Sequence, residues 1–190
     1  MAHGGQETEI KLSVPDSRYA RRLLQRAGFR VLKRRVLEAN TVFDTPENHL
    51  RQGGSLLRVR EAGGVVTLTY KGRAEISRHK RREELELTAS NAPMLANILK
   101  RLGFLPVFRY EKYRTELQRP RQRGVAMIDE TPVGVYIELE GTPQWIDRTA
   151  RALGFAEVDY ITLSYGRLYL DWCAHNGTQP GNMVFGRPLA

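Results

Sequence analysis

Charged residues recur at every second position in several strand-like segments of this chain. Side chains alternate between the two faces of a β-strand, so residues two apart share a face. Glu7, Glu9 and Lys11 therefore lie opposite Ile10 and Leu12 in the first segment. The same spacing recurs in Arg58 and Arg60, in Arg82, Glu84 and Glu86, in Lys112, Arg114 and Glu116, and in Glu138 and Glu140. The pattern predicts a sheet with one charged face and one apolar face.

Two explanations are open for the charged face. An antiparallel sheet commonly has one solvated face, and this explanation suffices for any single strand. Like charges two residues apart on several strands favour a bound ligand instead, because neighbouring carboxylates repel each other and so do neighbouring guanidinium groups. Glutamate pairs suit a hard divalent cation, and arginine or lysine pairs suit phosphate oxygens. If the sheet closes into a barrel with these residues inside, the ligand expected is a metal-bound polyphosphate.

Hydrophobic periodicity predicts eight strands and four helices. The strands are expected at 6–13, 30–43, 54–61, 64–71, 79–88, 107–118, 123–130 and 133–141, and the helices at 17–27, 92–102, 143–153 and 162–173. Antiparallel strands with intervening helices are typical of the α+β class. We expect one domain over residues 1–173 and a flexible tail over 174–190, since the tail is rich in Gly, Pro and Asn.

Composition narrows the possible partners. The chain has 190 residues and a formal net charge of +9, which favours an anionic partner such as nucleic acid, a membrane surface or a phosphorylated small molecule. No apolar run approaches the roughly 18 residues of a membrane helix, and the N-terminus lacks the apolar core of a signal peptide. The single cysteine and four scattered histidines exclude an internal disulfide and predict no zinc site. We therefore expect a cytoplasmic protein that makes no membrane contact.

Taken together, the motifs resemble those of the CYTH superfamily, the triphosphate tunnel metalloenzymes, named for class IV adenylate cyclase and thiamine triphosphatase. Glu7-Thr8-Glu9-Ile10-Lys11 fits the ExExK signature, and the resemblance covers about residues 6–170. Matching stretches follow in order: Leu57-Arg58-Val59-Arg60, Thr69-Tyr70-Lys71-Gly72, Arg82-Glu83-Glu84-Leu85-Glu86, Lys112-Tyr113-Arg114, Asp129, Ile137-Glu138-Leu139-Glu140 and Ser164-Tyr165. The resemblance implies an eight-stranded antiparallel β-barrel that forms a triphosphate tunnel, with helices packed on the outside.

The resemblance also implies roles for individual residues. The metal, Mg²⁺ or Mn²⁺, would be bound by Glu7, Glu9, Asp129, Glu138 and Glu140. The phosphates would be bound by Lys11, Arg58, Arg60, Lys71, Lys112 and Arg114. Glu7, Glu9 and Lys11 form the expected catalytic set. Arg82, Glu84 and Glu86 match the family pattern as further tunnel residues, whose structural and catalytic roles the sequence does not divide; buried ion pairing is the less favoured alternative for them.

Three functions remain open. The favoured one is metal-dependent hydrolysis of a small-molecule triphosphate, namely tripolyphosphate, thiamine triphosphate or a nucleoside triphosphate. The second is cyclisation of ATP to cyclic AMP and pyrophosphate, although the HFxxxxExExK leader of characterised class IV cyclases is missing here. The third is a non-catalytic module that binds polyphosphate or RNA through the arginines between residues 18 and 35. Nucleic acid is the less favoured partner, because RNA-binding motifs are missing from the sequence.

Overall fold

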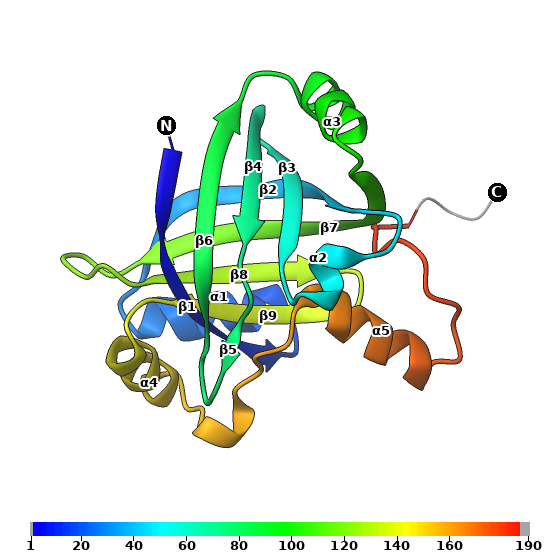
Figure 1. The fold of residues 1–190 in the computed structure, drawn as a ribbon. Helices are drawn as coiled ribbons and strands as arrows, with labels where there is room; N and C mark the ends of the chain where they lie inside the picture. The colour runs from blue at the N-terminus through cyan, green and yellow to red at the C-terminus, as the bar shows by residue number, and fades with distance from the viewer. Residues whose placement is uncertain (1, 187–190) are drawn as a thin grey trace.

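An antiparallel sheet closes on itself to form a barrel (Figure 1). The computed structural model describes residues 2–186. Neighbouring strands around the barrel are β1, β9, β8, β7, β2, β3, β4 and β6, and β6 pairs with β1 to close it. The strands are β1 (Ala2–Val14), β2 (Arg30–Asp44), β3 (Leu56–Ala62), β4 (Val65–Lys71), β6 (Lys80–Ala89), β7 (Leu105–Gln118), β8 (Val125–Thr131) and β9 (Gly134–Glu140). The eight-stranded antiparallel barrel and its α+β class are thus confirmed.

Four longer helices lie outside the barrel: α1 (Ser17–Arg26), α3 (Ala92–Arg101), α4 (Pro143–Ala152) and α5 (Tyr165–His175). Each begins after a polar side chain that accepts a hydrogen bond from a backbone N–H in the first turn, as at Asp16, whose Oδ1 lies 2.7 Å from the Tyr19 nitrogen. The four helices expected from periodicity are confirmed. Three short elements were not expected: α2 (His49–Gln52), β5 (Glu75–Ile76) and the 3₁₀ helix η1 (Glu157–Asp159).

The first strand is longer than the alternation predicted. Residues 2–9 pair with β6, and residues 9–14 pair with β9, so β1 changes neighbours at Glu9. Gly4 and Gly5 disfavour a strand when the local sequence alone is considered. Their pairing with Leu85 and Glu84 is supplied by a segment about eighty residues away, which local periodicity cannot show.

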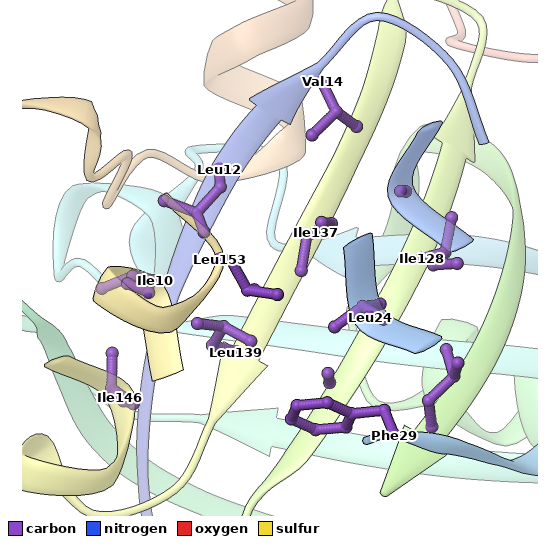
Figure 2. Close-up of a cluster of buried hydrophobic side chains, with 14 of the residues drawn as sticks. Ile10, Leu12, Val14, Leu24, Phe29, Ile128, Ile137, Leu139, Ile146 and Leu153 are labelled. Carbon is purple, nitrogen blue, oxygen red and sulfur yellow. The ribbon is translucent and has the colours of Figure 1, made fainter. Parts of the chain in front are cut away.

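The main hydrophobic core lies outside the barrel, between the sheet and two helices (Figure 2). Ile10, Ile137 and Leu139 point outward from β1 and β9 and pack against Leu24 of α1 and Ile146 of α4. Because the apolar side chains are used outside the wall, the alternate positions inside are free to carry charge. Helix α3 covers a smaller cluster around Val59 and Leu99, and α5 covers a third that is rich in tyrosine.

The helices do not cover the whole outer face. In Figure 1 no helix lies in front of β6. Leu85 and Leu87 on the outer face of β6 are 46% and 53% exposed. Helices therefore pack outside the barrel as expected, over β1, β8 and β9 and, through α3, over β3 and β4, while the outer face of β6 around Leu85 and Leu87 stays exposed.

The segment after Cys173 contacts the barrel. Residues 178–186 do not extend away from the domain but form a strap along β7: the Met183 nitrogen donates to the Arg109 carbonyl at 3.0 Å, and the Glu111 nitrogen donates to the Met183 carbonyl at 2.8 Å. Strand β8 pairs with β7 only from Tyr113 onward, so the strap occupies the edge that β8 leaves free. Met183 is 1% exposed. Composition carries no information on this open edge, so the contact could not be predicted from it. The flexibility expected for residues 174–190 stays a prediction, and residues 187–190 lie outside the described part.

Candidate functional site

The inside of the barrel holds a cavity of about 920 Å³. Charged side chains from six strands line its centre, and these include every expected site residue except Asp129: Glu7, Glu9, Lys11, Arg58, Arg60, Lys71, Arg82, Glu84, Glu86, Lys112, Arg114, Glu138 and Glu140. The alternation brings them together because each strand directs its odd or even positions to one face. Glu9 and Lys11, for example, are 4% and 2% exposed on the inside of β1, whereas Ile10 lies in the outer core.

One group of ion pairs joins β1 to β9 and β6. The Lys11 ammonium lies 3.2 Å from the Glu9 carboxylate and 3.3 Å from that of Glu138. Lys80, at the start of β6, lies 2.9 Å from Glu9. Burial alone would raise the pKa of Glu9, but the surrounding cations, with Lys11 and Lys80 foremost, hold it well below its usual range. Glu9 is therefore a buried carboxylate that stays charged.

A second group surrounds Asp129 on β8. Arg114 donates to Asp129 Oδ1 at 2.7 Å, while Lys112 and the Tyr165 hydroxyl donate to Oδ2 at 2.8 and 2.6 Å. Arg114 also donates to Glu138 at 2.7 Å. Burial would raise the pKa of Asp129, but Arg114 and Lys112 lower it to about 2. Its charge therefore fixes the two cations in place.

Asp129 differs in position from the other expected metal ligands. Its side chain is 0% exposed and does not line the cavity. Both oxygens already accept hydrogen bonds from neighbouring side chains. The sequence showed an acidic residue at the correct strand position, but it could not show that Arg114, Lys112 and Tyr165 lie between this carboxylate and the cavity. Asp129 therefore holds these three side chains in the described structure, and its expected role toward a metal stays a prediction.

A third group lies on β3, β4 and β6. The Arg58 guanidinium donates to Thr69 Oγ1 and to the Tyr110 hydroxyl, both at 3.2 Å. Lys71 lies 2.8 Å from Glu7 and 3.0 Å from Glu84. The remaining expected residues of this wall are also paired: Arg82 with Glu7 at 3.2 Å and Arg60 with Glu86 at 3.5 Å. Arg82, Glu84 and Glu86 thus take part in ion pairs within the wall, and their roles toward a ligand stay predictions.

Among the cavity carboxylates, Glu140 differs from the others. No cation lies within ion-pairing distance of it in the described residues. Burial and the charges of Glu7 and Glu138 raise its pKa to about 7. A carboxylate held near other carboxylates without a cation is an arrangement that a bound cation would stabilise. The donor chemistry therefore fits a divalent metal, although no three His, Cys, Asp or Glu side chains of residues 2–186 form a ready-made site.

Sequence reasoning missed two buried charges of this network. Glu38 on β2 lies 3.6 Å from Lys112 and 3.8 Å from Arg60, and it is 4% exposed. Burial would raise its pKa, but Lys112 and the surrounding arginines lower it to about 2. Lys80 was the other, two positions before Arg82. The sequence did hold a signal for both: Glu38 lies two positions before the polar residue Asn40, and Lys80 lies two positions before Arg82, so each shares a strand face with an inward residue.

No helix in the described part of the chain is long and apolar enough to cross a membrane. A Methanocaldococcus jannaschii protein with the provisional name of an adenylate cyclase, MJ0240, is 29% identical over 134 residues, which cover 70% of this chain and 75% of that protein.

Solved structures share the fold. The PH1819 protein of Pyrococcus horikoshii superimposes with a TM-score of 0.74 at 23% identity, covering 87% of this chain and 98% of that one. HpAC1 of Hippeastrum, a provisionally named adenylyl cyclase described as having a dominant triphosphatase activity, gives a TM-score of 0.60 at 18% identity, with 92% and 97% covered. Residues 5–165 match the CYTH domain. The chain therefore belongs to the CYTH domain family.

Proposed function

We propose that this protein hydrolyses a small-molecule triphosphate inside the barrel with the help of a divalent metal. The observation that carries the proposal is the convergence of buried cations on one cavity. Lys11, Arg58, Lys71, Lys112 and Arg114 come from four strands, and each is at most 9% exposed. Cations this deep, facing a cavity instead of solvent, suit a polyanion that enters the barrel.

The ion pairs within the wall prepare these cations for a ligand. Arg58 is held by Thr69 and Tyr110, and Arg114 is held by Asp129 and Glu138, so neither guanidinium must lose much side-chain freedom when it binds phosphate. Phosphoryl transfer depends mainly on positioning and on neutralising charge. We infer that Arg58, Arg60, Lys71, Lys112 and Arg114 bind the phosphates, with Lys11 between the phosphates and the carboxylates Glu9 and Glu138.

A divalent metal completes the proposed chemistry, since the CYTH family is in general metal-dependent. Four cavity carboxylates would hold it: Glu7, Glu9, Glu138 and Glu140. Their oxygens are the donors that Mg²⁺ and Mn²⁺ prefer. When bound, the metal supplies charge neutralisation for the phosphate oxygens. The assay described next compares Mg²⁺ with Mn²⁺.

The test incubates the full chain with Mg²⁺ or Mn²⁺ and one substrate at a time. The substrates are tripolyphosphate, thiamine triphosphate and ATP. Free phosphate and cyclic AMP are both measured, and EDTA removes the metal in a parallel set. Metal-dependent release of phosphate supports the proposal. Cyclic AMP without phosphate would instead support the cyclase that the name of the archaeal relative suggests. Tight binding of tripolyphosphate without turnover would support a non-catalytic module.

Variants separate the site from the fold. Glu140→Gln removes a carboxylate that has no ion pair to lose, and Glu9→Gln removes one held by Lys11 and Lys80. We expect both to lose metal-dependent activity while circular dichroism shows a folded chain. The matched control is Glu61→Gln, which changes an exposed carboxylate on β3 and should keep the activity. Full activity of Glu140→Gln and Glu9→Gln would refute the assignment.

A further inference from the structure

Tyr165, the first residue of α5, reaches two cations of the cavity wall that come from different strands. The Lys11 ammonium lies 5.0 Å from the centre of the tyrosine ring, and the Lys112 ammonium lies 4.8 Å from the same centre. Lys11 belongs to β1 and Lys112 to β7, and β9 and β8 separate these two strands around the barrel. Tyr165 is buried and lines the cavity. A single side chain from a helix thus contacts both lysines.

The ring of Tyr165 is fixed from two sides. Its hydroxyl donates to Asp129 Oδ2 at 2.6 Å, the same oxygen that accepts from Lys112. Burial and the charge of Asp129 raise the pKa of Tyr165 well above its usual value, so the hydroxyl keeps its proton and remains a donor. The ring of Tyr136 packs edge to face against it at a centroid distance of 5.7 Å. The ring therefore has its position before any ligand binds.

The chain just before α5 is attached to the backbone of Lys11 itself. The Lys11 nitrogen donates to the Ile161 carbonyl at 2.8 Å, and the Ile161 nitrogen donates to the Lys11 carbonyl at 2.9 Å. Helix α5 begins after Ser164, whose side chain accepts a hydrogen bond from a backbone N–H of the first turn. Residues 161–165 therefore hold Lys11 twice, at its backbone through Ile161 and at its ammonium through the tyrosine ring.

A lysine gains from such support because its four-carbon stem is flexible. Lys11 and Lys112 each lie close to two carboxylates, which could draw the ammonium along the wall and away from a ligand. The face of an aromatic ring attracts a cation as well, and does so more strongly where water is excluded. Fixing a long side chain before the ligand arrives strengthens binding by roughly two- to tenfold, because its freedom is not lost on binding.

We propose that Tyr165 is a positioning residue for the substrate: its ring holds the ammonium groups of Lys11 and Lys112 where both contact the same chain of phosphates. The inference rests on the proposed function, in which both lysines serve the phosphates. It assigns the preorganisation of these two cations to an uncharged side chain, which the charge pattern of the strands does not reveal.

The experiment measures binding of tripolyphosphate to the full chain by calorimetric titration in EDTA, which prevents metal-dependent turnover. Tyr165→Leu removes the ring and should weaken binding about tenfold, the combined effect on two lysines. Tyr165→Phe keeps the ring and should stay within about threefold of the wild type. The matched control is Tyr136→Leu, which removes a similarly buried ring that is not part of the cavity lining and should keep the wild-type affinity.

Two further measurements separate positioning from a purely structural effect. In a Lys112→Met background only the contact with Lys11 is left to lose, so adding Tyr165→Leu should weaken binding about threefold instead of about tenfold. Replacing Tyr165 by pentafluorophenylalanine keeps the shape of the ring but removes the negative charge from its face. This variant should bind tripolyphosphate about threefold more weakly than Tyr165→Phe. Because it fills the same space, it also serves if circular dichroism shows that Tyr165→Leu does not fold.

The outcomes distinguish the two proposals. Unchanged affinity in Tyr165→Leu, an equal loss in Tyr136→Leu, or a loss of the same size in the Lys112→Met background would overturn the positioning role while the triphosphate site stands. If Tyr165→Leu does not fold, equal affinities of the fluorinated variant and Tyr165→Phe would overturn it. If tripolyphosphate fails to bind the wild type, the proposed function fails and the positioning role fails with it.

Discussion

Replacing Asp129 by asparagine tests whether one buried carboxylate holds the cationic wall together. The substitution keeps the shape of the side chain and removes its charge from beneath Arg114 and Lys112. These cations retain only Glu138 at 2.7 Å and Glu38 at 3.6 Å as ion-pair partners. We expect the variant to fold, but with a lower free energy of unfolding.

Two considerations give the size of the effect. Lowering the pKa of Asp129 from 3.8 to about 2 favours its charged form by roughly 2 kcal/mol. Removing one partner of a buried ion pair costs about 3–5 kcal/mol, and the remaining contacts to Glu138 and Glu38 place this case near the lower limit. Asp129→Asn should therefore lose about 3 kcal/mol, measured at pH 7 by urea denaturation followed by circular dichroism.

The pH dependence gives an independent check. Because the pKa of Asp129 is lower in the folded state, its contribution is complete above pH 4 and is lost as the pH falls toward 2. The difference between wild type and variant should accordingly shrink between pH 4 and pH 2. The control is Glu130→Gln, the next residue on β8, whose partner Arg35 is 45% exposed, so its loss should stay below about 1 kcal/mol. A loss for Asp129→Asn no larger than that of the control would refute the reasoning.

Three further predictions follow from the described contacts. Tyr165→Phe removes only the hydroxyl that donates to Asp129 at 2.6 Å, so urea denaturation should show a loss of about 1–2 kcal/mol. Glu140→Gln should be more stable than the wild type at pH 8 in EDTA and should lose this advantage near pH 4. The reason is that the pKa of Glu140 is raised to about 7 in the folded state, so its charged form destabilises the fold as the pH rises from about 4.5 to 7. Equal stability of the two proteins at pH 8 would contradict this assignment. Gly124→Ala places a methyl group against the Trp145 ring, and the overpacking should cost about 1–3 kcal/mol in the same denaturation assay, whereas Gly64→Ala tests the separate cost of a positive φ at a turn with open space.

The alternation of charged and apolar residues correctly predicted which side chains face the inside of the barrel, because this property depends only on the geometry of each single strand. The faces of Glu7, Glu9 and Lys11 follow from strand geometry alone, whatever the partner strands are. The cavity lining confirms which face those three residues occupy. Their roles toward metal and phosphate remain predictions, because the described contacts are ion pairs of the protein with itself.

The features that sequence reasoning missed depend on distant contacts. Asp129 is covered by side chains of β7 and α5. The spacing of residues along a strand shows which face a side chain occupies, but not how deeply it is buried on that face. The strap around Met183 depends on where β8 stops pairing with β7, which is decided by the barrel as a whole. Glu38 could have been found, because Asn40 two positions later continues its polar face.

The change of partner at Glu9 has a consequence for the order of assembly. Strand β1 is the first to be synthesised, but the seam closes only when residues 2–9 meet β6 and residues 9–14 meet β9. Contacts so far apart in sequence form slowly. Until then β1 is an unpaired edge, and the neighbouring charges Glu7 and Glu9 disfavour its pairing with another copy of itself. Carboxylates that are ion-paired with Lys71, Lys11 and Lys80 in the finished barrel thus disfavour self-association of the nascent chain while the seam is open.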